Sequence, residues 1–150
     1  GKVMQKQLDR GKIMIDMSNG AKCLRGRKLC NGKLGATGFC FGGGVTNYLA
    51  VELGDQLNAA VPFYGTAPKA EDVSRISAPL LIHYAEDDPR VNATRAGYEK
   101  ALKAAGRSYE MHVYEGTRHG FHNNSTPRYN EAAAKLAWSR TTAFFGKHLA

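Results

Sequence analysis

The sequence predicts an α/β fold with about four parallel strands flanked by helices. Apolar segments of strand length alternate along the chain with longer helical patterns, which is typical of parallel sheets with helical crossovers. The glycine-rich segment GFCFGGG, at residues 38–44, directly follows one apolar strand and directly precedes a helical pattern, so strand and helix meet there in a sharp turn. Because no repeat, linker or low-complexity segment divides the sequence, we expect residues 1–150 to form one domain.

The individual elements are predicted from the spacing of apolar residues. Residues 4–28 predict a helix, although Gly11 and Gly20 interrupt its apolar pattern. Short apolar or alternating runs predict strands at 33–39, 58–63, 79–84 and 108–114. Further helices are expected at 43–53, 93–105 and 129–148, with a short connection at 69–76. The apolar side of the last helix is expected to consist of Ala133, Leu136, Ala137, Thr141, Phe144 and Phe145.

Cys40 lies at the centre of the glycine-rich segment. The pattern G-x-C-x-G between a strand and a helix is that of a nucleophile elbow, which presents one side chain at the apex of a strained turn. Gly38 and Gly42 have no Cβ, so strand and helix can approach closely. The positive end of the following helix favours thiolate over thiol. A buried cysteine in a glycine-rich turn would fit this segment about as well, because free cysteine is often a core residue.

Two downstream segments carry side chains that could act with Cys40. The strand at 79–84 runs into a loop with three carboxylates, Glu86, Asp87 and Asp88. The strand at 108–114 is followed by His119, in the kind of loop where a parallel sheet presents catalytic groups. The chain order nucleophile, acid, histidine is the order used by α/β-hydrolases.

From about Asn31 to Ala150 the sequence resembles the dienelactone hydrolase (carboxymethylenebutenolidase) family of α/β-hydrolases. The matching segments are GKLGATGFCFGGG, VPFYG, PLLIHYAEDDPRVN, YEMHVYEGTRHGFHN and RYNEAAAKLAWSRTTAFF. A cysteine at the elbow is specific to that family within the fold. The resemblance implies a truncated α/β-hydrolase, because a complete member has a further stretch before this point that forms the first half of the sheet. Residues 1–30 then correspond to the remnant helix that precedes the nucleophile strand.

The resemblance also implies roles for individual residues. Cys40 corresponds to the nucleophile, His119 to the general base and acid, and Asp88 to the residue that orients the histidine. Asp87 and Glu86 are rivals for that last role, and Asp88 is preferred because the family pattern places the acid directly before a segment like residues 89–92. The backbone N–H of Phe41 is expected in the oxyanion hole. The aromatic residues expected to line the substrate pocket are Tyr64 and Phe121, although core packing would explain both equally well.

The implied reaction is hydrolysis of a small ester or lactone by a Cys-His-Asp mechanism, with no cofactor and no metal. A thioester forms on the cysteine, and water activated by the histidine hydrolyses it. In the family, the first half of the sheet supplies a second oxyanion donor, an acidic residue near the thiol and a basic residue for a substrate carboxylate. None of these can be assigned from this sequence. The alternative is therefore a catalytically impaired remnant that acts only as an assembly or interaction domain.

Net charge, the length of apolar runs and the cysteine content indicate which partners and which compartment to expect. Residues 1–33 hold nine Lys or Arg and two Asp, which gives +7 of the net +8. A solvated helix face explains this better than a nucleic-acid surface, because no aromatic interleaving accompanies the charge. No apolar run is long enough to span a bilayer, and three cysteines with one at the elbow favour a reducing, cytoplasmic compartment. We therefore expect neither nucleic acid nor membrane as a partner.

Since the nucleophile strand would be a hydrophobic edge, we expect a homodimer or a complementary N-terminal half.

Overall fold

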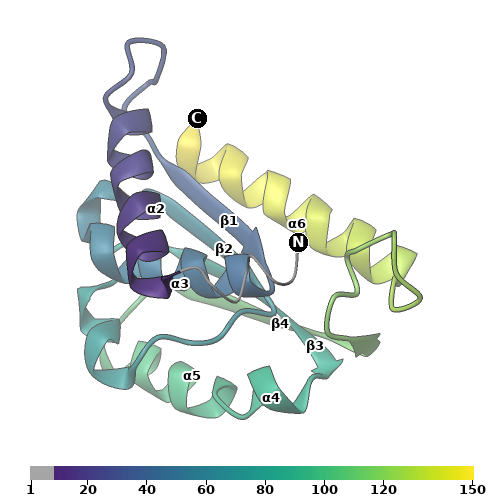
Figure 1. The fold of residues 1–150 in the computed structure, drawn as a ribbon. Helices are drawn as coiled ribbons and strands as arrows, with labels where there is room; N and C mark the ends of the chain where they lie inside the picture. Colours follow the sequence, from purple (N-terminus) through teal and green to yellow (C-terminus); the bar gives the residue numbers. More distant parts are fainter. Residues whose placement is uncertain (1–8) are drawn as a thin grey trace.

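The structure, a computed structural model that describes residues 9–150, contains a four-stranded parallel sheet flanked by helices (Figure 1). The strands are β1 (Gly35–Phe39), β2 (Ala59–Phe63), β3 (Leu80–Asp87) and β4 (Tyr109–Arg118). The α-helices are α2 (Arg10–Arg25), α3 (Phe41–Leu53), α4 (Pro89–Asn92), α5 (Arg95–Ala104) and α6 (Glu131–Leu149). Two short 3-10 helices, η1 (Gly54–Gln56) and η2 (Ala70–Arg75), complete the chain order. The predicted α/β class with four parallel strands is confirmed.

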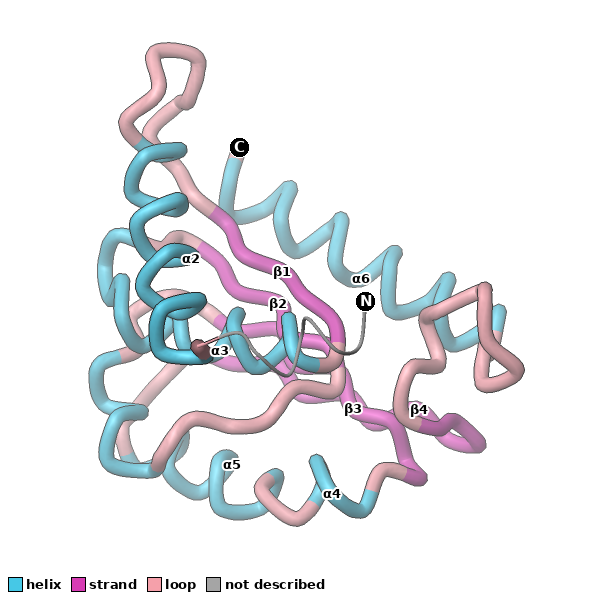
Figure 2. The backbone as a smooth tube through the Cα atoms, viewed as in Figure 1, coloured by secondary structure: helices cyan, strands magenta, loops and turns pink. Residues whose placement is uncertain are grey.

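The sheet is covered on both faces, which gives three layers (Figure 2). The strands are ordered β1-β2-β3-β4, so each strand pairs with its neighbour in sequence. Successive strand residues point to opposite faces: Leu80 and Ile82 join the core that includes residues of α3 and α5, whereas Leu81 joins the core beneath α6. Fully buried strands on both sides explain why β2 and β3 read as continuous apolar runs in the sequence.

Several element boundaries differ from the predictions. β3 and β4 continue to Asp87 and Arg118, beyond the strand ends that apolar pattern alone indicated. Of the helix predicted over residues 4–28, the structure shows Arg10–Arg25, and residues 4–8 lie outside the described part of the chain. On α6 the placement of Leu136 on the apolar side is wrong, because its side chain is 48% exposed, and Ala134 is buried instead.

A buried polar chain fixes α6 to the sheet. Thr141 donates its hydroxyl proton to the Ala137 carbonyl at 2.8 Å, so its oxygen must accept from His83 Nε2–H at 3.1 Å. His83 Nδ1 therefore accepts from the Tyr114 hydroxyl at 2.9 Å, and Arg140 donates to the Tyr114 oxygen at 3.1 Å. Burial lowers the pKa of His83 to about 3, with the positive charge of its neighbours adding to the effect, so the ring is neutral, as this pattern requires. Every member of the chain has a partner, which makes the attachment of α6 specific.

The β1 side of the molecule is the less protected one. Among residues 9–150 no strand lies beside β1 on its outer edge. On α2, Ile15, Met17 and Leu24 expose half or more of their surface, and the one buried residue of that helix is Ser18. These apolar side chains of α2 are therefore not covered by the part of the chain that the structure describes.

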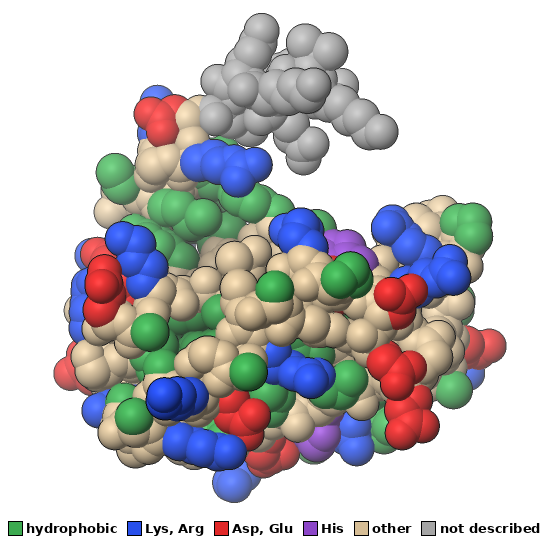
Figure 3. Space-filling model, turned by 90° about the horizontal axis from the view of Figure 1, so that it is seen from below, with side chains coloured by type: hydrophobic (Ala, Val, Ile, Leu, Met, Phe, Trp, Pro, Cys, Tyr) green, Lys and Arg blue, Asp and Glu red, His purple; other side chains and the backbone are tan. Residues whose placement is uncertain are grey.

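Surface charge, helix hydrophobicity and the state of the cysteines can be compared with the partners and compartment that the sequence predicts. On the face shown in Figure 3, basic and acidic side chains are interspersed and do not form one basic patch. No helix within residues 9–150 is long and apolar enough to cross a membrane. Cys23, Cys30 and Cys40 are all free thiols, and the cytoplasmic location expected from them stays a prediction.

Candidate active site

Each of the four strands is directly followed by a residue that lies at the carboxyl edge of the sheet. Cys40 follows β1, Tyr64 follows β2, Asp88 follows β3 and His119 follows β4. The carboxyl ends of parallel strands meet at one edge, and this edge is where open α/β sheets bind their ligands. Residues that are far apart in the sequence are thereby brought to one place.

The turn at Cys40 has the geometry of an elbow. Cys40 has a φ of 57° and a ψ of −116°, a backbone conformation that L-residues rarely adopt, and α3 begins at the next residue. A Cβ on Gly38 would lie 2.2 Å from the Gly42 carbonyl oxygen, so only glycine allows β1 and α3 to meet here. The expectation that Gly42 must also lack a Cβ is wrong, because a Cβ there would meet open space. The close contact at Gly42 is made by its backbone carbonyl group.

Cys40, His119 and Asp88 form a connected chain. His119 Nε2 lies 3.0 Å from the Cys40 Sγ, and His119 Nδ1 lies 2.5 Å from Asp88 Oδ2. A carboxylate can only accept, so Nδ1 carries a proton towards Asp88 and Nε2 is left free to accept one from the thiol. The carboxyl group of Asp88 is also the N-cap of α4, where it accepts from Val91 N–H at 3.4 Å. The residue is 4% exposed, so its orientation is held by burial as well as by hydrogen bonds.

The two rival carboxylates point elsewhere. Glu86 accepts a hydrogen bond from Gly116 N–H at 2.8 Å, and Asp87 pairs with Arg118 at 3.4 Å on the surface. The structure therefore brings Asp88 to the histidine and not either of its neighbours.

Tyr64 forms a wall beside the thiol and the histidine. It has a φ of 35°, the second non-glycine residue with a positive φ in the described chain, and its ring centroid lies 5.0 Å from that of His119. Burial raises its pKa to about 12, with the negative charge of a Cys40 thiolate as the next cause, so the phenol keeps its proton. Tyr64, Cys40 and His119 share a cavity of about 420 Å³. Phe121, expected on the pocket wall, is fully buried behind Tyr64 at a ring distance of 5.5 Å and does not line this cavity.

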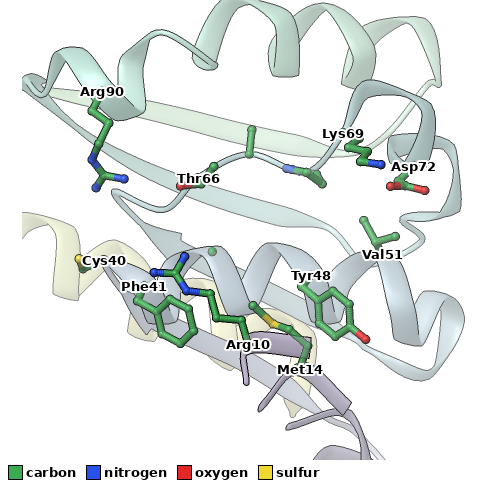
Figure 4. Close-up of a pocket in the computed structure, with 13 residues that line it drawn as sticks. Arg10, Met14, Cys40, Phe41, Tyr48, Val51, Thr66, Lys69, Asp72 and Arg90 are labelled. Atoms are coloured by element: carbon green, nitrogen blue, oxygen red, sulfur yellow. The ribbon is translucent and has the colours of Figure 1, made fainter. Parts of the chain in front are cut away.

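A second cavity, of about 580 Å³, opens on the other side of Cys40 (Figure 4). Its wall carries Arg10, Arg90 and the ring of Phe41, and the Arg10 guanidinium lies 5.8 Å from that ring. Within residues 9–150 neither arginine forms an ion pair, so both are available to an anionic group of a ligand. Sequence reasoning missed both residues. Arg90 could have been found from its place two residues after Asp88, whereas no motif marks Arg10.

The N-terminus of α3 supplies a donor next to the thiol. Phe41 is the first residue of α3, and the first N–H groups of a helix have no partner within the helix. The role of this N–H as one donor of an oxyanion hole stays a prediction. His119 and His122 are three positions apart, but no group of three potential metal ligands is found within the described residues.

Comparisons with known proteins identify the family. The family model described as "Dienelactone hydrolase family" matches residues 1–149. "Putative carboxymethylenebutenolidase" of Saccharolobus solfataricus is 34% identical over 113 residues, which cover 75% of this chain and 43% of that protein. "Protein usf" of Aquifex pyrophilus is 35% identical over 120 residues, with 78% of this chain and 52% of that protein covered.

A solved structure gives the same result. The crystal structure of a "Putative Dienelactone Hydrolase" from Klebsiella pneumoniae superposes with a TM-score of 0.81 at 30% identity, over 91% of this chain and 61% of that one. The chain thus spans about half the length of the curated relatives it matches. Since the match runs through the elbow, the strand ends and α6, the chain belongs to the dienelactone hydrolase family.

Proposed function

We propose that this chain hydrolyses small esters or lactones through a thioester on Cys40. The observation that carries the proposal is the continuous contact from Asp88 through His119 to the Cys40 sulfur, with distances of 2.5 and 3.0 Å, at the carboxyl edge of the sheet. Family membership supports the class of reaction. Nucleophile, base and orienting group in hydrogen-bond reach are the signature of an activated nucleophile.

The proposed reaction has two halves. His119 Nε2 takes the thiol proton as the Cys40 sulfur attacks the carbonyl carbon, and the resulting oxyanion is stabilised by Phe41 N–H. The carbon–oxygen bond to the leaving group then breaks, and His119 returns the proton to the departing oxygen. In the second half His119 takes a proton from water, whose oxygen attacks the thioester. The carbon–sulfur bond breaks and the thiolate is protonated again.

Tyr64 and the two cavities shape the proposed substrate site. The neutral Tyr64 ring packs against His119 and limits the space on one side of the thiol. On the other side, the guanidinium groups of Arg10 and Arg90, which form no ion pair within residues 9–150, attract negative charge. A small ester or lactone fits cavities of about 420 and 580 Å³, and an anionic substituent would find its contacts on the arginine side.

Hydrolysis of p-nitrophenyl acetate tests this function, with the burst and the steady state recorded separately. We expect turnover that disappears in the Cys40→Ala variant, because no other thiol lies near His119. A Cys23→Ala variant is the matched control, since Cys23 is an exposed thiol on α2 outside both cavities, and it should retain the full rate.

Two outcomes would contradict the proposal. A burst that depends on Cys40 without later turnover would show a reactive thiol that cannot deacylate, and the chain would then act as an assembly domain. Equal rates in the Cys40→Ala and unmodified proteins would remove the thiol from the reaction. Loss of one oxyanion donor alone lowers rates by about 10²–10³, so slow turnover that still depends on Cys40 supports the proposal.

We also propose that the β1 edge is covered by another polypeptide, either a second copy or a complementary N-terminal half. The support is the open edge of β1 together with the exposed apolar residues of α2. Sedimentation at micromolar concentration should give a homodimer of the isolated chain. A Thr37→Pro substitution should weaken it by removing a backbone donor from β1. A monodisperse monomer that binds no added N-terminal half of a relative would contradict this proposal.

A further inference from the structure

A third cavity continues from the catalytic one towards the start of α6. It has a volume of about 520 Å³ and shares Phe39 and His122 with the cavity that contains Cys40. Beyond these two shared walls it is lined by Tyr129 and Trp138, from the loop before α6 and from α6 itself. We call this space the aromatic groove, defined by Phe39, His122, Tyr129 and Trp138. Figure 1 shows the loop between β4 and α6, which supplies His122 and Tyr129 to this lining, and the helix that follows it.

Three rings of the groove lie close together, and the groove is partly open to solvent. The Phe39 and His122 centroids are 5.0 Å apart, and those of His122 and Trp138 are 5.8 Å apart. Exposure is 38% for Phe39, 38% for Tyr129 and 46% for Trp138. Isolated exposed apolar residues are common, but several large rings around one hollow indicate a binding surface. These rings contact one another and leave no gap for insertion, but their exposed parts offer a surface on which a further flat ring can stack.

The two basic side chains that line the groove, Lys135 and His122, do not place a free positive charge where such a ring would bind. Lys135, the one ammonium on its wall, is held by Glu131 at 2.6 Å. Burial lowers the pKa of His122, so its ring is uncharged near neutral pH and serves as an aromatic surface. The groove therefore differs in chemistry from the arginine-lined cavity on the other side of Cys40.

We propose that the aromatic groove binds a flat aromatic group of an ester whose carbonyl carbon lies at Cys40, so that Trp138 determines specificity. The proposal rests on the proposed function in that the ester reacts at Cys40. Continuity supports this occupant: a ligand that fills both cavities passes from the thiol over Phe39 and His122 to Trp138 without leaving a lined surface.

Trp138 allows a direct binding test, because it is the only tryptophan of the chain. The Cys40→Ala protein is titrated with 4-nitroacetanilide, an amide analogue of a nitrophenyl ester, and tryptophan fluorescence is followed. We expect saturable quenching, because the nitroaromatic ring would lie against the indole. This readout does not need catalysis, so it remains informative if ester turnover fails. Quenching that rises linearly without saturation would show random collisions and overturn the proposal.

Kinetics with matched substrates and variants provide the second test. Trp138→Ala should raise KM for 2-naphthyl acetate about three- to tenfold, the size expected for loss of one aromatic contact, and leave vinyl acetate unchanged. Leu136→Ala is the control, because Leu136 is similarly exposed on α6 but does not line the groove, and it should change neither substrate. Equal effects of both variants, or of Trp138→Ala on both substrates, would overturn the proposal. So would a concentration-dependent blue shift of Trp138 that follows dimer formation, because a second copy would then occupy the groove.

Discussion

Replacing Asp88 by Asn is expected to lower kcat for ester hydrolysis by about 10⁴, the loss known for this change in a serine triad. In the structure Asp88 Oδ2 accepts the proton of His119 Nδ1. An Asn in the same place can present its amide N–H to that nitrogen, which favours the tautomer with a proton on Nε2. That nitrogen then cannot take the proton of the Cys40 thiol. Steady-state hydrolysis of p-nitrophenyl acetate measures the effect.

Asp87→Asn is the matched control for this prediction. Its carboxylate is one residue away and 67% exposed, and it pairs with Arg118 on the surface. An exposed pair of this kind contributes little to stability and does not touch the histidine, so kcat should stay within about a factor of two to three. A loss of activity in Asp87→Asn with none in Asp88→Asn would contradict the prediction, because it would show that Asp87 and not Asp88 orients His119.

The second large effect is expected for Gly65→Ala, which should destabilise the protein by about 3 kcal/mol or more. A Cβ on Gly65 would lie 2.2 Å from the backbone carbonyl carbon of Gly43, so the segment after β2 and the start of α3 could not keep their contact. Neither side of this contact is a flexible side chain that could move away. Urea denaturation of both proteins gives the change in the free energy of unfolding.

Gly97→Ala provides the comparison, because it introduces the same methyl group in a helix. Gly97 lies in α5 and has no atom within 4 Å of its Cβ position. Alanine is the better helix former, so this variant should match or exceed the parent by up to about 1 kcal/mol. Equal stability of both variants would show that the segment after β2 adapts more easily than its backbone contact indicates.

The strands and helices were largely predictable because buried positions are occupied by apolar residues, whose spacing can be seen in the sequence. β2 and β3 are buried on both sides, and their unbroken apolar runs follow from that. The exceptions have physical causes. Residues near the end of β4 are polar and partly exposed, so no apolar pattern signals that the strand continues to Arg118. Leu136 is apolar but lies on the open side of α6, where the fold within residues 9–150 gives it no partner.

The candidate site was only partly predictable. Cys40, Asp88 and His119 are marked by local patterns at strand ends, and the structure places them in contact. Arg10 reaches the cavity by the packing of α2 beside α3, a long-range contact that no local pattern encodes. Phe121 illustrates the reverse: the family resemblance implied a place on the pocket wall, whereas its side chain is buried in the core just after Gly120, which has a positive φ.

The left-handed backbone at Cys40 has a consequence for engineering. A non-glycine residue held in such a conformation costs on the order of 1–3 kcal/mol, and glycine would relieve that cost. Laboratory evolution that selects for heat resistance alone would therefore reward removal of the thiol. Libraries aimed at a more robust protein should keep position 40 constant, because at this site thermal selection and catalytic selection act in opposite directions.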